Sequence, residues 1–263
     1  MTVFFDLRSL LAGSLVGGVL GLVGGGGSVL AVPLLVYGVG VESPHIAIGT
    51  SALAVCVSAL GNLLAHARAG HVKWRCAGVF SAAGILGAAV GSTFAKYVDG
   101  HRLLTLFGLM MILIGLVTLR PPSRAERHDV RLSRETARAL LPPLIGTGAV
   151  VGALSGFFGI GGGFLIVPGL MAATGMPIIA AVGTSLVSVA AFGATTAANY
   201  ALSGLVDWRI AALFIVGGIA GGFVGVAGGR RLSGRKHALR LTFGLIVIAV
   251  GFYVTIKGVA AYV

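Results

Sequence analysis

Residues 21–33 read GLVGGGGSVLAVP, and residues 156–168 read GFFGIGGGFLIVP. Each stretch interrupts a long apolar segment with a run of glycines and then reaches a proline, Pro33 or Pro168. A glycine run is a poor helix interior, because glycine loses more backbone entropy on folding than any other residue. The two stretches therefore predict a break inside an apolar helix, once in each half of the chain.

Further landmarks recur in the same order, 134 to 136 residues apart. They pair Gly49-Thr50-Ser51 with Gly183-Thr184-Ser185, Gly70-x-Val72-x-Trp74-Arg75 with Gly204-x-Val206-x-Trp208-Arg209, and Phe107-Gly108-Leu109 with Phe243-Gly244-Leu245. Matches that stay in register along the chain indicate an internal duplication. We predict a first repeat over residues 1–120, a linker over 121–138 and a second repeat over 139–263.

The composition is that of a membrane protein. Hydrophobic residues make up 57% of the 263 positions, charged residues 10%, and the mean hydropathy is +1.02, whereas a soluble domain is about 25% charged. Stretches such as Leu103 to Leu119 contain no charged residue and are long enough to cross a bilayer as helices. We therefore predict an all-α integral membrane protein with no soluble domain.

Other protein classes fit the sequence less well. The net charge of +12 does not indicate a nucleic-acid partner, because the basic residues lie between apolar segments and form no single face. Cys56 and Cys76 lack metal-ligand spacing and are expected to be small buried hydrophobes, and no metal or cofactor is predicted. The first twenty residues lack a convincing signal peptide, so they are expected to belong to the mature fold.

Two topologies are open for the first segment of each half, Leu7 to Val39 and Leu140 to Thr174. It either crosses the membrane as one long helix, or it forms a re-entrant helical hairpin with the glycines at its tip. Three ordinary spans follow in each half, near residues 46–66, 74–97 and 103–119, then 178–200, 208–228 and 237–256.

The distribution of basic residues favours the hairpins. With hairpins the two repeats are inverted and 14 of the 19 Lys and Arg fall on one face, which the positive-inside rule assigns to the cytoplasm. Only five lie on the other face: Arg8, Lys96, Arg102, Arg209 and Lys257. With single crossings the halves share one orientation, and the division falls to 12 and 7. We therefore predict that the basic loops are cytoplasmic, including a basic helix of the linker lying on the membrane surface.

A small-anion site is predicted where the two hairpin tips converge. A half-helix that starts at Ser28 or Phe164 directs its free N–H groups and positive dipole end into the membrane. Polar side chains in the next helix of each half add hydrogen-bonding groups. The predicted substrate-binding residues are Gly24, Gly25, Gly26, Gly27, Ser28, Thr50, Ser51, Asn62, Gly159, Gly161, Gly162, Gly163, Thr184, Ser185 and Asn199, and His66 is either a proton relay or a solvated interfacial residue.

Other glycines, such as Gly87-x-x-x-Gly91 and Gly217, Gly221, Gly225 and Gly229, are expected to serve helix packing alone.

The doubled pattern of a glycine break, a downstream proline, Gly-Thr-Ser and Gly70-His71-Val72-Lys73-Trp74 resembles the sulfite exporter TauE/SafE family of membrane permeases. The resemblance covers about Leu11 to Val254. It implies transport of a small sulfur-containing anion, such as sulfite or an organosulfonate, across the bacterial inner membrane. It also implies that the matching glycine and Gly-Thr-Ser segments contact the substrate. The two tips differ in sequence, because Ser28 of the first half corresponds to Gly163 of the second, and Gly25 corresponds to Ile160.

The expected mechanism is alternating access around a midplane site. No acidic residue lies inside a span, so no carboxylate proton relay is expected. A gated anion channel with the same architecture is the alternative. An intramembrane enzyme using Ser28 and His66 is less favoured, because no nucleophile turn surrounds the serine. The expected partners are the substrate anion and the lipid bilayer, and the sequence leaves a homodimer open.

Overall fold

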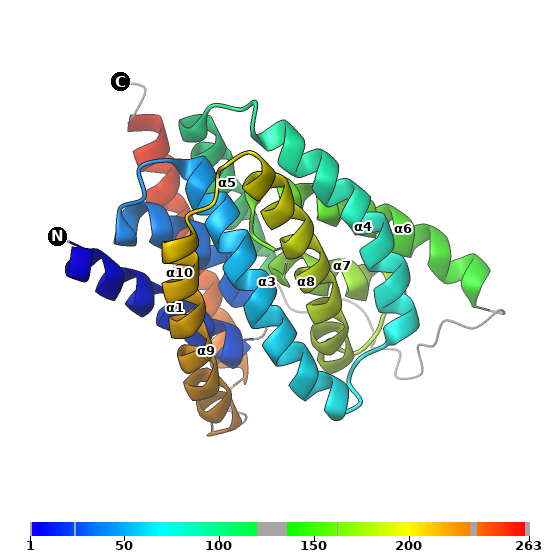
Figure 1. Ribbon diagram of the computed structural model, residues 1–263. Coiled ribbons are helices and arrows are strands. Elements are labelled where there is room, and N and C mark those ends of the chain that lie inside the picture. The colour runs from blue at the N-terminus through cyan, green and yellow to red at the C-terminus, as the bar shows by residue number, and fades with distance from the viewer. Residues whose placement is uncertain (1, 24, 120–135, 162, 232–235, 261–263) are drawn as a thin grey trace.

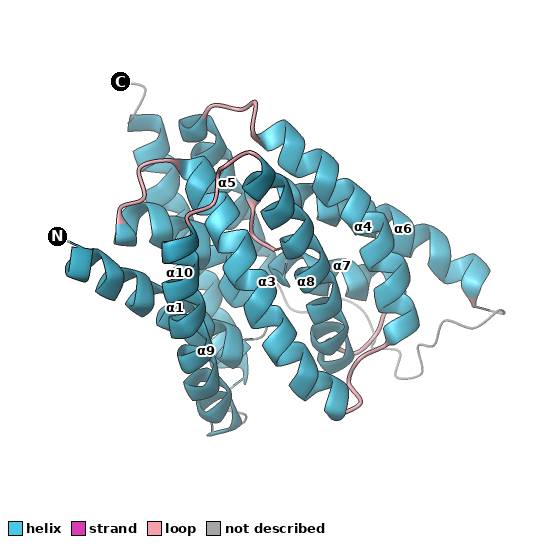
Figure 2. Cartoon of the chain, viewed as in Figure 1, coloured by secondary structure: helices cyan, strands magenta, loops and turns pink. Residues whose placement is uncertain are grey.

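The computed structural model describes residues 2–23, 25–119, 136–161, 163–231 and 236–260. This part of the chain is all-helical and contains no strand (Figure 2). The first half contains α1 (Thr2–Val23), the 3-10 helix η1 (Gly25–Leu30), α2 (Ala31–Pro33), the π-helix η2 (Leu34–Val39), α3 (Pro44–Arg68), α4 (Trp74–Ala95) and α5 (Gly100–Leu119). The second half contains α6 (Ala137–Phe158), α7 (Gly163–Thr174), α8 (Ile178–Leu202), α9 (Trp208–Arg231) and α10 (Lys236–Ala260). The predicted linker helix lies almost wholly outside the described residues.

Within the described residues, seven helices are long and apolar enough to cross a membrane: α3, α4, α5, α6, α8, α9 and α10. Large apolar side chains such as Leu86, Phe94 and Phe223 point outward and are 64–75% exposed, as expected where lipid replaces water around the protein. The chain is therefore a multi-pass membrane protein, and the six predicted ordinary spans are confirmed as helices that end within four residues of their expected bounds.

The first segment of each half is broken and folded back on itself. Helix α6 ends at Phe158, and Gly159 adopts the left-handed conformation with φ of 65°. A Cβ at Gly169 in α7 would lie 3.2 Å from Val151 in α6, although a continuous helix would separate these residues by about 27 Å. In the first half, a Cβ at Gly27 would lie 2.5 Å from the Leu20 nitrogen of α1. Both segments are therefore helical hairpins, and a single unbroken first helix is not formed.

Small residues hold each hairpin against the opposite half. Helix α1 packs on α9, and a Cβ at Gly17 would lie 1.9 Å from the Gly218 oxygen. Helix α6 packs on α4, and a Cβ at Gly87 would lie 2.2 Å from the Ala149 oxygen. Figure 1 shows α1 on one flank of the molecule beside α9 and α6 on the opposite flank beside α4. The packing role predicted for Gly87, Gly91, Gly217, Gly221 and Gly225 is confirmed, since each meets backbone atoms of the partner helix; Gly229 has no described packing.

The contacts also fix the relative directions of the paired helices. Along α1 and α9 the contacts rise together in residue number, from Gly13 with Phe214 to Gly18 with Gly225, so this pair is parallel, as is α4 with α6. Two further pairs between the halves, α3 with α8 and α5 with α10, are antiparallel. In α3 and α8, Gly49 meets Tyr200 and Cys56 meets Gly193, and α5 and α10 cross in the same antiparallel sense.

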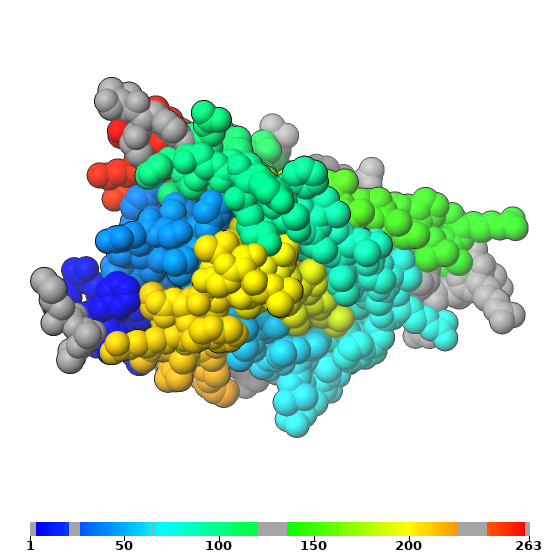
Figure 3. Space-filling view, turned by 45° about the horizontal axis from the view of Figure 1, so that its top comes forward, coloured from blue at the N-terminus to red at the C-terminus, as the bar shows by residue number. Residues whose placement is uncertain are grey.

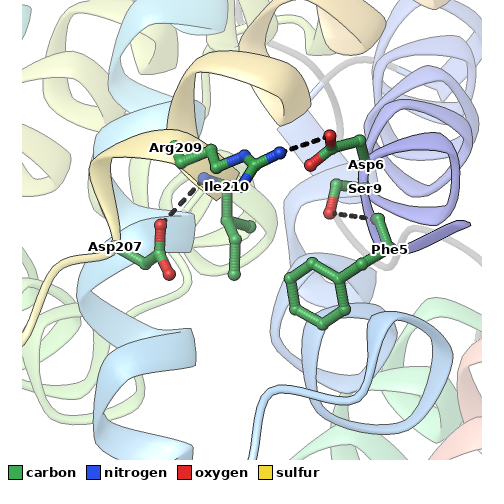
Figure 4. Close-up of polar contacts among 6 residues, drawn as sticks. All are labelled: Phe5, Asp6, Ser9, Asp207, Arg209 and Ile210. Atoms are coloured by element: carbon green, nitrogen blue, oxygen red, sulfur yellow. Dashed lines mark hydrogen bonds and ion pairs between the residues drawn. The ribbon is translucent and has the colours of Figure 1, made fainter. Parts of the chain in front are cut away.

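Polar contacts fasten the start of α9 to α1. Asp207 accepts a hydrogen bond of 2.9 Å from the Ile210 N–H and so caps α9, and Arg209 makes a 2.6 Å ion pair with Asp6 of α1 (Figure 4). At the far end of α8, Lys96 of α4 donates a 2.9 Å hydrogen bond to Ser203. Figure 3 shows the yellow α8–α9 turn directly beside the end of α4.

Candidate functional site

The tip of the second hairpin lies on α3 of the first half. Gly159 and Gly161 have φ values of 65° and 63°, which only glycine adopts without strain. A Cβ at Gly159 would lie 2.2 Å from Ile48, and one at Gly161 would lie 2.5 Å from Val55. Glycine is therefore needed twice at this tip, for its backbone conformation and for the approach to α3.

Ser51 lies between these two contacts and joins the tip to α3. Its buried hydroxyl lies 2.9 Å from the Ile48 oxygen and 3.3 Å from the Gly159 oxygen. A hydroxyl has one proton, so it donates to one of these carbonyls at a time. In the second half, Ser185 is also buried and donates to the Val182 oxygen at 2.8 Å.

The first hairpin reaches the same part of the interior. Segment η1, which contains Gly25, Gly26, Gly27 and Ser28, contacts both α7 and α8. Ser28 is fully buried, and so is Gly163 at the start of α7. The returning arms of the two hairpins therefore meet inside the molecule. Gly24 and Gly162 lie outside the described residues.

The remaining residues of the Gly-Thr-Ser motifs anchor loops of the opposite half. Thr50 Oγ1 accepts a 3.0 Å hydrogen bond from the Asp207 N–H, and Thr184 Oγ1 accepts one of 3.0 Å from the Lys73 N–H. The glycine before each threonine allows the loop to come close. A Cβ at Gly49 would lie 2.3 Å from the Leu205 oxygen, and one at Gly183 would lie 2.9 Å from the His71 oxygen.

The two predicted asparagines bond residues outside the tips. Asn62 donates to the Ser58 oxygen of its own helix at 3.1 Å. Asn199 accepts a 2.8 Å hydrogen bond from Lys96 and donates to Ser92 at 2.6 Å. It lies 14 residues beyond Ser185, about 21 Å along α8. Their predicted contact with substrate has no support from the positions of the tips and stays a prediction.

Sequence reasoning missed a line of polar pairs between α4 and α8. Ser81 bonds Ser188 at 2.8 Å, Ser92 bonds Asn199, and Lys96 bonds Ser203. All three pairs have residue numbers that differ by 107, because the two helices run parallel in register. The serines of α4 gave no signal of their own, since isolated hydroxyls in apolar helices usually bond their own backbone.

His66 lies at the end of α3, with its ring centroid 5.7 Å from that of His71. The imidazole therefore has a ring partner in the loop that Thr184 anchors. Its predicted role as a proton relay stays a prediction.

The tips offer hydrogen-bonding chemistry without charged side chains. The hydroxyls of Thr50, Ser51, Thr184 and Ser185 bond carbonyls or backbone N–H groups. No group of three or more His, Cys, Asp or Glu in the described part of the chain could hold a metal ion. Helix starts and hydroxyls in an apolar interior can bind a small anion.

The fold and the meeting hairpins define a multi-pass helical membrane protein of the transporter class. The family model of the sulfite exporter TauE/SafE family matches residues 9–254, and the chain belongs to this family. A probable membrane transporter protein of Xylella fastidiosa is 52% identical over the whole length of both chains. The probable membrane transporter protein YunE of Bacillus subtilis is 29% identical over 91% of this chain and 94% of its own.

A further relative, from Methanocaldococcus jannaschii, is the probable membrane transporter protein MJ0441, 28% identical over 67% of this chain and 65% of its own. No solved structure matches the chain. Family membership makes the protein a probable membrane transporter and implies a protein that is not an enzyme.

Proposed function

We propose that this protein carries a small sulfur-containing anion, such as sulfite or an organosulfonate, out of the cell by alternating access. The anion is held where the two hairpins meet, by helix-start N–H groups and the hydroxyls beside them. The observation that carries this proposal is the contact of η1 with α7 next to the Ser51–Gly159 hydrogen bond. Broken helices that direct their N-termini at a shared midplane site are a recurring solution for anionic substrates.

Inverted repeats are part of the same proposal. A two-fold axis in the membrane plane exchanges the α1–α9 contact with the α6–α4 contact and pairs α3 with α8 and α5 with α10. These are the four most extensive contacts between the halves. Repeats of equal orientation would make α3 parallel to α8, yet this pair is antiparallel. The packing directions therefore support inversion, and with it two hairpins that enter from opposite sides.

The proposed cycle needs no coupling ion to export an anion. An inside-negative potential favours outward movement of an anion by about 2.3 kcal/mol per charge per 100 mV. The small-residue contacts that join each hairpin to the opposite half would let the tips move with that half as a unit. The basic loops face the cytoplasm in this arrangement, where they attract the anion before it binds.

Sulfite flux into proteoliposomes tests the proposal. The purified protein is reconstituted, the membrane potential is clamped at several values, and uptake of labelled sulfite is compared with uptake of chloride. We expect saturable sulfite flux that responds to potential and is inhibited by other sulfur oxyanions. A flux that rises linearly with sulfite would indicate a channel, and the lack of any anion flux would overturn the midplane site.

A further inference from the structure

Four buried polar atoms near the two ends of the α3–α8 pair have no hydrogen-bond partner. They are Nδ1 of His45, Nδ1 of His66, Nδ1 of His71 and Oη of Tyr200. Unpaired buried polar atoms are uncommon, because each has given up water without receiving a replacement bond. Finding four of them in two ring pairs calls for an explanation.

The inner ring pair consists of His66 and His71, with ring centroids 5.7 Å apart. The outer ring pair consists of His45 and Tyr200, with centroids 6.5 Å apart. His45 and His66 belong to one helix and are 21 residues, about 32 Å, apart along it. The two pairs therefore lie at opposite ends of the same helix pair.

Each ring pair adjoins one Gly-Thr-Ser motif. A Cβ at Gly49 would lie 2.8 Å from the Tyr200 Cβ, and one at Gly183 would lie 3.0 Å from the His71 Cβ. His66 and Tyr200 are 134 residues apart, the same interval that separates Thr50 from Thr184. The motif beside Tyr200 continues to Ser51, which bonds the hairpin tip at Gly159.

The rings offer the chemistry that an oxyanion needs at this depth. A phenol donates one hydrogen bond, and a neutral imidazole donates one from either nitrogen. The surroundings of the two pairs differ in charge. The inner pair is flanked in sequence by Arg68, Lys73 and Arg75, with no acidic residue from 66 to 75. At the outer pair the charges are mixed: His45 hydrogen-bonds the Val98 backbone and lies near the Asp99 carboxylate, and Lys96 bonds Asn199, the neighbour of Tyr200.

We propose that the two ring pairs are peripheral binding stations for the transported oxyanion, one on each side of the hairpin tips. This inference rests on the proposed function and adds a path to it. The anion first bonds the inner pair, where the cations concentrate it, then passes to the tips, and leaves by the outer pair, where fewer cations hold it.

Exchange measured separately from each face of the membrane tests the stations. Tyr200→Phe and His66→Phe each keep an aromatic ring and remove its polar atoms. Loss of one hydrogen bond to a charged acceptor corresponds to about a tenfold weaker half-saturation. We expect Tyr200→Phe to raise the half-saturating sulfite concentration about tenfold at the face of the outer ring pair, and less than about twofold at the opposite face, which carries the basic loops. His66→Phe should raise it about tenfold at the face with the basic loops and less than about twofold at the other face.

Matched variants separate the stations from general damage. Tyr253→Phe makes the same chemical change in a half-exposed ring that packs on Tyr37, and we expect exchange like that of the unaltered protein. If Tyr200→Phe fails to fold, His45→Leu removes the other member of the outer pair and should shift the same face.

An equal change at both faces, or no change at either, would overturn the stations and leave the ring atoms to bind water. Loss of saturable exchange in the unaltered protein would instead overturn the proposed function.

Discussion

Thr50 of α3 accepts a 3.0 Å hydrogen bond from the backbone N–H of Asp207, a residue 157 positions away at the start of α9. The corresponding threonine, Thr184, accepts one of equal length from Lys73 at the start of α4. Each threonine thereby holds the loop that begins a helix of the opposite half. The Gly-Thr-Ser motifs thus join the two halves reciprocally, in addition to lying beside the hairpin tips.

Thr50→Val and Thr184→Val should each destabilise the protein. Valine keeps the shape of threonine and leaves the Asp207 or Lys73 N–H without its acceptor, which costs about 1–3 kcal/mol. We expect the thermal midpoint of the detergent-solubilised protein to fall by roughly 2–8 °C.

Thr50→Ser is the control for this prediction, because it retains the accepting oxygen and should preserve most of the midpoint. Equal midpoints for the valine and serine variants would show that the hydrogen bond contributes nothing measurable.

Neighbouring glycines of α9 should differ sharply in their tolerance of alanine. A Cβ at Gly221 would lie 1.9 Å from the Ser14 oxygen of α1, whereas one at Gly222 would lie 3.7 Å from the Gly17 oxygen, an ordinary contact. Backbone cannot move aside as a flexible side chain can, so Gly221→Ala should separate α1 from α9. We expect a cost of at least about 1–3 kcal/mol, measured as a lower thermal midpoint and lower yield.

Gly222→Ala serves as the control on the same helix. Alanine is about 1 kcal/mol better than glycine in a helix interior, so this variant should be as stable as the unaltered protein or slightly more so. A loss of stability that is equal in both variants would contradict the packing explanation.

Much of this architecture follows from the sequence. The glycine runs predicted both helix breaks, because glycine is unfavourable in a helix interior. The lengths of the apolar stretches predicted the ordinary spans. The small-residue spacing of Gly217, Gly221 and Gly225 predicted a close helix contact. It did not identify α1 as the partner, because local spacing carries no information about which distant segment supplies the opposing backbone.

The hydrogen-bond partners at the candidate site were less predictable, because they too come from distant segments of the chain. Thr50 stands out as a polar residue in an apolar helix, but its donor is an N–H group in the other half. Asn199 is predicted to bind substrate, and that stays a prediction; the structure adds its hydrogen bonds with Lys96 and Ser92, which the sequence did not indicate. A polar side chain in a membrane span needs a hydrogen-bond partner, and only the packing of the helices shows which residue supplies it.

The proposed inversion predicts opposite sides for two equivalent loops. Ala69 and Ser203 are both exposed and are 134 residues apart. Ser203→Cys should react with a membrane-impermeant maleimide in intact spheroplasts, and Ala69→Cys only after permeabilisation. The native Cys56 and Cys76 are buried and should give little background.

Tyr97→Cys is the positive control for the outer face in this labelling, since Tyr97 is 84% exposed and follows α4. Reaction of Ala69→Cys and Ser203→Cys from the same side would give the two halves one orientation and would remove the basis for hairpins that enter from opposite faces.

Ser51 should matter more for transport than for stability. Its hydroxyl bonds either Ile48 within α3 or Gly159 at the hairpin tip, at 2.9 and 3.3 Å. The carbonyl of Ile48 belongs to a helix whose own hydrogen bonds persist, so Ser51→Ala should shift the thermal midpoint by less than about 3 °C. The tip would lose its polar contact with α3, and we expect sulfite flux in proteoliposomes to fall about tenfold or more.

Ser14→Ala is the matched control, because Ser14 likewise donates to a carbonyl of its own helix, Leu10, at 2.9 Å but lies on α1 outside the tips. It should keep nearly full flux. If Ser14→Ala and Ser51→Ala lose flux to the same degree, hydroxyls matter here only for helix packing, and the anion does not depend on the contact between the second hairpin and α3. A loss confined to Ser51→Ala, with an unchanged midpoint, would tie transport to that contact, because a packing defect would lower both quantities together.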